Sequence, residues 1–193
     1  MRSVAVLFSL LLTVPAAAQA PAPAPAAAEI YSVTAGQSSL TYHLIHKLHK
    51  VDGVSKKVEG KAQLTPGGQV KVMVRAPVES FDSGDNNRDT HMKETVEAAR
   101  HPTVELKAVG EGVTPPASYP ATVKKTFKAQ LLFHGVTKTM DIPVDITFES
   151  ATRIKASSSF SISLDGFNVE RPSLLFVKVN DDLKIDAAVT FTK

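Results

Sequence analysis

The chain has 193 residues, a length typical of one domain or at most two. Its hydrophobic residues (43%), charged residues (21%) and net charge of +3 are ordinary for a globular protein. The lysines are scattered and tryptophan is absent, which argues against a nucleic-acid-binding protein. The chain contains no cysteine, which excludes disulfides, thiolate metal sites, a cysteine nucleophile and a lipoprotein anchor.

Residues 1–18 have the three-part layout of a secretory signal peptide. Arg2 precedes an apolar run from Val4 to Val14, and small residues follow this run. A helix of that length would rise only about 16 Å, which is too short for a stable membrane span. We expect export and cleavage after Ala18, with cleavage after Ala20 as the alternative. An uncleaved N-terminal helix is the competing interpretation.

Residues 19–29 are rich in proline and alanine, which predicts an extended spacer with nothing to bury. The folded part is expected to occupy residues 30–193 as a single domain. No second apolar run approaches membrane-spanning length, so we expect no stable membrane span.

From Tyr31 onward, apolar and polar residues alternate, which indicates β-strands with one buried and one solvated face. Strands are expected near residues 30–35, 38–48, 56–65, 70–80, 102–110, 123–134, 138–149, 153–164 and 182–192. Many long strands joined by short turns suit a closed antiparallel barrel or a strongly curled sandwich.

One segment, 86–100, departs from this alternation. Its apolar residues recur at the helical spacing i, i+4 and i+7 (Met92, Val96 and Ala99). Asp85 or Asn87 is placed to cap the start of a helix. We expect one short helix over this segment, packed across a barrel end.

Three of the six histidines follow the spacing His43-x-x-His46-x-x-His49. On a strand, His43 and His46 point to opposite faces, and His43 and His49 lie about 20 Å apart, so we expect no metal site there. His46 falls on the apolar face, as a hydrogen-bonded core residue or as a ligand contact. No nucleophile elbow, complete calcium loop or glycine-rich phosphate loop occurs, so we expect no catalytic residues and no cofactor.

The expected interior face carries many small side chains. They are Ala62, Ala76, Ala108, Ala129, Ala156, Ser158 and Ala187. A barrel of about eight strands either fills its interior with side chains or holds one small ligand. Small residues among aromatic ones favour a cavity, with a filled barrel that acts as a structural or partner-binding module as the alternative.

Several motifs occur in the order seen in the YceI-like family, which the chain resembles over residues 30–192. They are Tyr42-x-Leu44-x-His46, the stretch Val54 to Gly60, Ser80-Phe-Asp-Ser-Gly84 with Asn87-Arg-Asp-Thr-His-Met92, His101-Pro-Thr-Val-Glu-Leu106, and Leu132-Phe-His-Gly-Val-Thr-Lys138. The resemblance implies an all-β, single antiparallel lipocalin-like barrel in the periplasm. It also implies a long apolar pocket for polyisoprenoids or other long-chain amphiphiles.

By the same resemblance, recurring family positions are occupied by His46, Arg88, Asp89, His91, Met92, His134 and Lys138. Arg88 and Asp89 are expected to tie the helix to the barrel rim, and His134 is expected to shape a hairpin turn. The stretches 54–59 and 95–100 lack aromatic residues that the family often carries, so the resemblance leaves the ligand undetermined.

We therefore expect a periplasmic protein that buries the hydrocarbon tail of an isoprenoid, quinone or fatty amide. The expected ligand-binding residues are Tyr42, Leu44, His46, Val72, Val74, Arg88, His91, Met92, Leu106, Phe127, Leu131, Phe133, Met140, Ile142, Phe160 and Ile162. His46 and Arg88 are expected to meet a polar head group. An enzyme that acts on a lipid-like substrate in the same pocket is the rival hypothesis. The sequence does not decide between a monomer and a homodimer.

Overall fold

The computed structural model describes residues 27–46, 49–174 and 177–193, with the side chains of residues 46, 49, 174 and 177 left out. The predicted signal peptide and most of the spacer lie outside the described residues. The elements are β1 (Glu29–Val33), β2 (Ser39–His46), β3 (His49–Ser55), β4 (Glu59–Leu64), β5 (Val70–Pro77), η1 (Val78–Ser80), α1 (Asn86–Thr95), β6 (Thr103–Gly110), β7 (Ala121–Phe133), β8 (Val136–Ser150), β9 (Arg153–Ser163), η2 (Asp165–Phe167), β10 (Ser173–Leu174), β11 (Val177–Lys178) and β12 (Asp182–Thr192).

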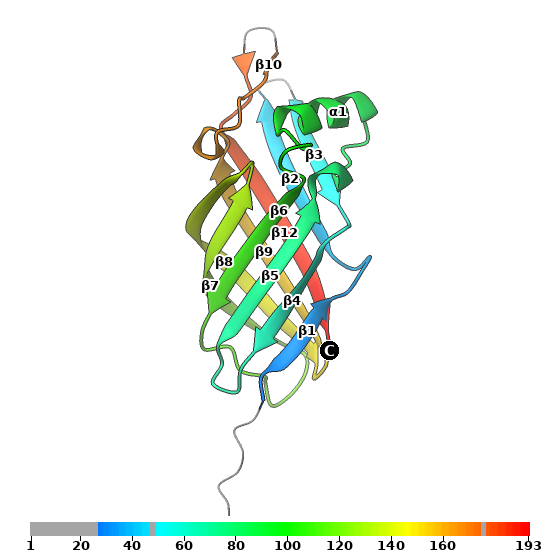
Figure 1. The fold of residues 1–193 in the computed structure, drawn as a ribbon. Helices are drawn as coiled ribbons and strands as arrows, with labels where there is room; N and C mark the ends of the chain where they lie inside the picture. Colours follow the sequence, from blue (N-terminus) through cyan, green and yellow to red (C-terminus); the bar gives the residue numbers. More distant parts are fainter. Residues whose placement is uncertain (1–26, 47–48, 175–176) are drawn as a thin grey trace, which may run out of the picture.

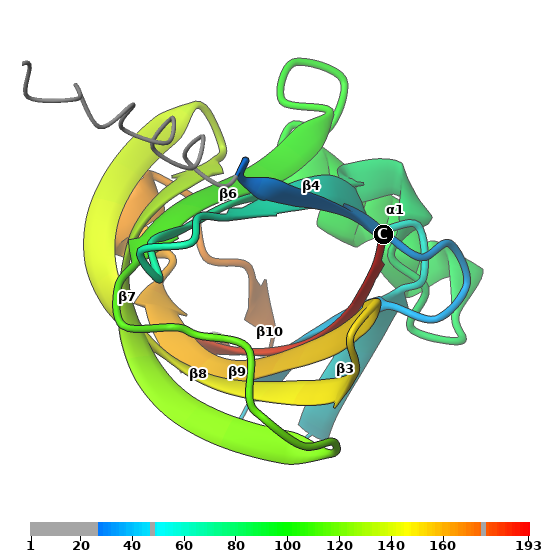
Figure 2. The same ribbon diagram turned by 90° about the horizontal axis from the view of Figure 1, so that it is seen from below.

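The large sheet is antiparallel and closes into a barrel. Its strand order is β1-β4-β5-β6-β7-β8-β9-β12-β2-β3, and β12 also pairs with β1, so eight strands form a ring. The view along the barrel in Figure 2 shows this ring. The prediction of a closed all-β barrel of about eight strands is confirmed. The strongly curled sandwich, which was the alternative, is not observed.

Strand β12 pairs with two different strands, β1 and β2, along the same edge. Near its C-terminal end it pairs with β1, with Val33 opposite Phe191, and nearer its N-terminal end it pairs with β2, with Leu44 opposite Leu183. Strands β2 and β3 therefore extend the sheet beyond the closed ring. A single bridge between Val54 and Asp82 joins the free edge of β3 to the segment before α1.

The predicted strand near residues 38–48 was wrong in one respect. The chain reverses after His46, and β3 returns along β2 with His49 opposite His46. The sequence shows no reversal there because residues 47–51 contain no Gly, Pro, Asn or Asp to mark a turn. The ends of the other predicted strands agree with the structure within three residues.

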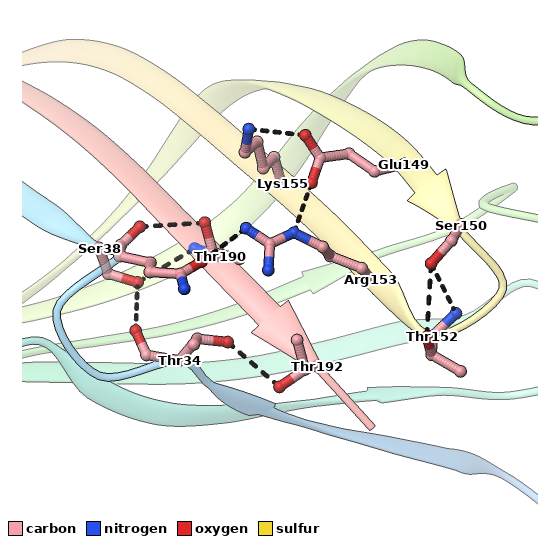
Figure 3. A network of polar contacts seen from close by, with 10 residues as sticks. Thr34, Ser38, Glu149, Ser150, Thr152, Arg153, Lys155, Thr190 and Thr192 are labelled. Carbon is pink, nitrogen blue, oxygen red and sulfur yellow. Dashed lines mark hydrogen bonds and ion pairs between the residues drawn. The ribbon is translucent and has the colours of Figure 1, made fainter.

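A polar network holds the crossing from β1 to β2 in place (Figure 3). Ser38 and Thr190 are buried, and the backbone N–H of Thr190 donates to the Ser38 hydroxyl over 3.0 Å. The Thr190 hydroxyl donates to the carbonyl of Gln37 over 3.0 Å, and the backbone N–H of Thr34 donates to the carbonyl of Thr190 over 2.8 Å. These bonds replace water for groups that the fold has buried.

Helix α1 lies at the barrel end opposite β1 and the C-terminus (Figure 1). The Asp85 carboxylate caps it and accepts hydrogen bonds from the backbone N–H groups of Asn87 and Arg88. The predicted helix over 86–100 was too long, because α1 ends at Thr95. The chain then turns back through Glu97, whose φ of +48° is left-handed and incompatible with a continuing helix.

Candidate ligand-binding cavity

A cavity of about 570 Å³ lies inside the barrel, a volume within the range of small-molecule sites. Its wall is mostly apolar and draws on two hydrophobic clusters. The deep cluster, at the β1 end, includes Tyr31, Phe127 and Phe148. The upper cluster, at the α1 end, includes Leu131 and Ile162. The barrel interior therefore offers a continuous apolar surface to a ligand.

Small side chains account for part of this space. Six of the seven small interior residues line the cavity, namely Ala62, Ala76, Ala108, Ala156, Ser158 and Ala187. Ala129 is the exception, since it is fully buried but does not line the cavity. A substitution at Ala129 therefore tests core packing, whereas a substitution at Ala108 tests the cavity itself.

Most of the residues predicted to bind a ligand meet at the cavity wall. They are Tyr42, Leu44, Val72, Val74, Arg88, His91, Met92, Leu106, Phe127, Leu131, Phe133, Ile142, Phe160 and Ile162. Met140 is different, because it packs against both hydrophobic clusters and does not line the cavity. The side chain of His46 lies outside the described part of the structure.

Sequence reasoning missed lining residues that lie outside the predicted strands. Val113 precedes β7, and Val169 and Val179 flank the β10–β11 hairpin, yet all three line the cavity and are buried. Their neighbours do not alternate regularly between apolar and polar residues, so the alternation typical of strands could not identify them. Their hydrophobicity inside proline-containing connections was the one available signal.

The first turn of α1 fixes the helix over the barrel end. The Arg88 guanidinium donates to the hydroxyl and carbonyl of Ser83 over 2.9 and 3.0 Å. The buried Asp89 carboxylate accepts from the backbone N–H of Ser83 over 3.1 Å. Because the neighbouring Asp82 is bridged to Val54, these bonds connect α1 to the edge of β3. Arg88 also lines the cavity, so it has both a structural contact and access to a ligand.

Tyr42 lines the cavity and lies close enough to α1 to be affected by the charges of Asp89 and Arg88. Burial raises the pKa of Tyr42 to about 12, and the negative charge of Asp89 contributes to the rise. The phenol therefore stays protonated near neutral pH and can donate a hydrogen bond to a bound head group. Its ring packs on Gly53, where a Cβ atom would clash with the ring, and lies 5.7 Å from that of Phe81.

His43 takes no part in the cavity. Its Nδ1 lies 2.7 Å from Asp52, and its Nε2 lies 2.8 Å from Asp186, on the outer face of the sheet. Its neighbours Tyr42 and Leu44 line the cavity, as alternation on β2 requires. Both ring nitrogens of His43 are thus engaged with carboxylates on adjacent strands.

A closed antiparallel barrel around an apolar cavity, with a helix at one end, defines a lipocalin-like barrel. The family model for the YceI-like domain matches residues 31–191. The chain belongs to the YceI-like family. The comparison with curated proteins found no match.

Solved structures share this fold at low sequence identity. A polyisoprenoid binding domain from Saccharophagus degradans, implicated in plant cell wall breakdown, is 17% identical with a TM-score of 0.69, and the match covers 84% of this chain and 97% of that one. BcnA from Burkholderia cenocepacia is 18% identical with a TM-score of 0.67, covering 82% and 98%. The YCEI protein of Campylobacter jejuni is 16% identical with a TM-score of 0.60, covering 77% and 88%.

Within the described residues, no helix has the length and apolar character needed to cross a membrane.

Proposed function

We propose that the protein binds a long-chain amphiphile, such as a polyisoprenoid, quinone or fatty amide, with its hydrocarbon tail inside the barrel. The observation that carries this proposal is the uneven polarity of the cavity wall. Arg88 and His91 border the cavity from α1, whereas aromatic and aliphatic residues of the deep cluster surround its other end. Arg75 also borders the cavity and pairs with Glu59 over 3.1 Å; it is half exposed, and His91 is more exposed still, with Nδ1 3.8 Å from Glu94. An amphiphile likewise has a polar head group at one end and an apolar tail at the other.

Burial of the tail supplies the binding energy. Each methylene group removed from water contributes about 0.8 kcal/mol, so a tail of about ten carbons gives roughly 8 kcal/mol before the entropy of association is subtracted. This leaves the head group to set orientation and specificity. Arg88 and the protonated hydroxyl of Tyr42 are its proposed partners. The polyisoprenoid binding domain from Saccharophagus degradans, which shares the fold, supports an isoprenoid as the first ligand to test.

We further propose that the protein works in the periplasm. The positive residue Arg2, the apolar run from Val4 to Val14 and the small residues that follow support export. A protein that encloses an apolar tail gives a water-insoluble molecule a path across an aqueous compartment. Fractionation of the producing cells, with detection of a mature N-terminus after Ala18 or Ala20, tests this proposal.

The binding proposal is tested by titrating the delipidated protein with a homologous series of fatty amides and prenols. We expect each added methylene to lower Kd about four-fold until the tail fills the cavity. An affinity that does not depend on chain length would exclude tail burial.

The role of Arg88 is tested separately with a carboxylate-headed amphiphile. Arg88→Gln should weaken its binding and leave the dependence on chain length unchanged. Lys93→Gln is the matched control, since Lys93 is a cation of the same helix that does not line the cavity. Equal losses in both variants would show that the net charge of α1 matters rather than contact with Arg88.

A further inference from the structure

Three side chains with metal-ligating groups face one another at the α1 end of the barrel. Nε2 of His101 lies 3.8 Å from Oε2 of Glu97, and Nε2 of His134 lies 4.0 Å from the same oxygen. One ligand atom of each residue lies within 4.8 Å of the other two. These distances exceed those of hydrogen bonds. Small side-chain rotations would place the three atoms at the roughly 2.0–2.2 Å from a common ion that zinc requires.

The unpaired ring nitrogen of His134 is the feature of this cluster that indicates a ligand. Its Nδ1–H donates to the carbonyl of Phe167 over 2.9 Å, which leaves the lone pair on Nε2. Nε2 is buried and has no hydrogen-bond partner among the described residues, an arrangement that costs stability. A histidine that donates one N–H to a backbone carbonyl and directs its other nitrogen into a cluster has the geometry of a metal ligand.

The backbone at two of these residues is left-handed. Glu97 has φ +48° and occupies the position after α1 that glycine normally takes. There Ala98 N–H donates to the Lys93 carbonyl over 2.9 Å, as in the usual glycine-terminated helix. His134 also has φ +48° and begins the two-residue turn between β7 and β8, where asparagine is preferred.

Among the described residues, Asn168 is the one other non-glycine residue with positive φ. Left-handed residues other than glycine and asparagine often mark functional sites. The ring of His101 completes the cluster by packing on Gly135, where a Cβ would lie 2.6 Å from its Cε1.

We propose that Glu97, His101 and His134 form a binding site for a divalent transition-metal ion, with Zn²⁺ as the best match. Two imidazoles and one carboxylate are a ligand set that zinc and ferrous iron accept, with a further position left for water. The ligands come from the turn after α1, the approach to β6 and the β7–β8 turn. The ion therefore joins α1 to the β7–β8 hairpin.

The proposed ion lies beside the cavity rather than inside it. None of its three ligands lines the cavity, but their chain neighbours Val96 and Phe133 do. Metal binding thus holds the rim of the cavity in position without contact to a lipid. This inference goes beyond the proposed lipid binding and is independent of it.

Arg100 is the competing cation. Its Nη1 lies 2.8 Å from Oε2 of Glu97, and its side chain is 74% exposed. An exposed ion pair of this kind contributes little, so a divalent ion displaces it readily. Arg100→Gln removes a positive charge near the ion and should tighten Zn²⁺ binding by about three-fold.

The test uses the purified protein without a polyhistidine tag, stripped by chelation and titrated with Zn²⁺ by calorimetry and with Co²⁺ by visible absorption. We expect one high-affinity equivalent of metal and the intense absorption of a low-symmetry Co²⁺ site. Glu97→Gly and His134→Asn remove a ligand, yet each introduces a residue that left-handed backbone prefers. Both variants should bind Zn²⁺ at least about 100-fold more weakly. Glu97→Gly should unfold at the same or a higher temperature than the parent in the absence of metal, whereas His134→Asn also loses the hydrogen bond to the Phe167 carbonyl and should unfold at a lower temperature.

His43→Gln is the matched control, because it removes an imidazole held between two carboxylates elsewhere on the barrel. It should leave the high-affinity equivalent intact. The proposal is overturned if the parent protein binds less than one equivalent of Zn²⁺, or if Glu97→Gly and His134→Asn bind it as tightly as the parent. Because the readout involves no lipid, failure of lipid binding would not affect this result.

Discussion

Replacing Ala108 with leucine adds three carbon atoms to the barrel cavity. Ala108 lines the cavity wall on β6. If the added carbons take the place of about three methylene groups of a bound tail, the loss is about 2.4 kcal/mol, or roughly 60-fold in Kd. The free energy of unfolding should not fall, because the leucine enters existing space. Titration with a fluorescent fatty-acid analogue gives the affinity, and urea denaturation gives the stability.

Ala129→Leu is the matched control for this experiment. Ala129 is the cross-strand partner of Ala108 on β7, but it is 0% exposed and does not line the cavity. Overpacking there should lower the free energy of unfolding by about 1–3 kcal/mol. If Ala108→Leu destabilises the protein as much as Ala129→Leu does, the barrel interior is filled and the reasoning from the cavity is refuted.

Three further predictions concern stability and titration. Ser38→Ala leaves the buried backbone N–H of Thr190 without its hydrogen-bond acceptor and should lower the free energy of unfolding by about 1–3 kcal/mol. Urea denaturation measures this loss, and an unchanged free energy would mean that another group accepts the hydrogen bond. Hydrogen bonds from the backbone N–H groups of Arg88 and Asn87 hold the pKa of Asp85 below its ordinary 3.8. The Asp85 carboxylate therefore adds to the free energy of unfolding above pH 3.8, and this stabilisation is lost as the pH falls through the lower pKa of the folded protein. Asp85→Asn keeps a capping group without a charge, and acid melting curves should show a smaller loss of stability in this variant than in the parent. Tyr42 should ionise near pH 12 in the folded protein and near 10 when unfolded, so its contribution to the unfolding free energy is lost as the pH rises from 10 towards 12. Burial also raises the pKa of Tyr31, so ultraviolet titration of Tyr42→Phe should show one late-ionising phenol fewer than the parent.

The alternation of side chains was sufficient to predict an antiparallel sheet with one buried face, but it left a closed barrel and a strongly curled sandwich open, and the family resemblance favoured the barrel. The long strands carry apolar residues at most of every second position, and antiparallel neighbours turn these residues toward one interior, as Ile142 on β8 and Phe160 on β9 do. The β2–β3 hairpin escaped prediction because Lys47 to Val51 lack turn residues. Strand β3 pairs with β2 from His49 opposite His46 to Ser55 opposite Leu40.

The cluster of Glu97, His101 and His134 could not be found from spacing. Two of its residues are four apart, but the third comes from a turn 33 residues further along the chain. The one histidine run that spacing offers, His43-His46-His49, was expected to hold no metal because its members would be spread along a single strand. That geometric argument was wrong, since the chain reverses and His49 on β3 lies opposite His46 on β2. Histidine in the first position of a two-residue turn before Gly135 was the local signal that set His134 apart.

The most direct test of ligand binding in the cavity is native mass spectrometry of the protein purified from a periplasmic extract. Solvent extraction and lipid identification follow from the same sample. We predict a stoichiometric adduct of a long-chain amphiphile, released unchanged into the organic phase. A bare protein mass that stays the same after incubation with prenols, quinones and fatty amides would contradict the proposed function.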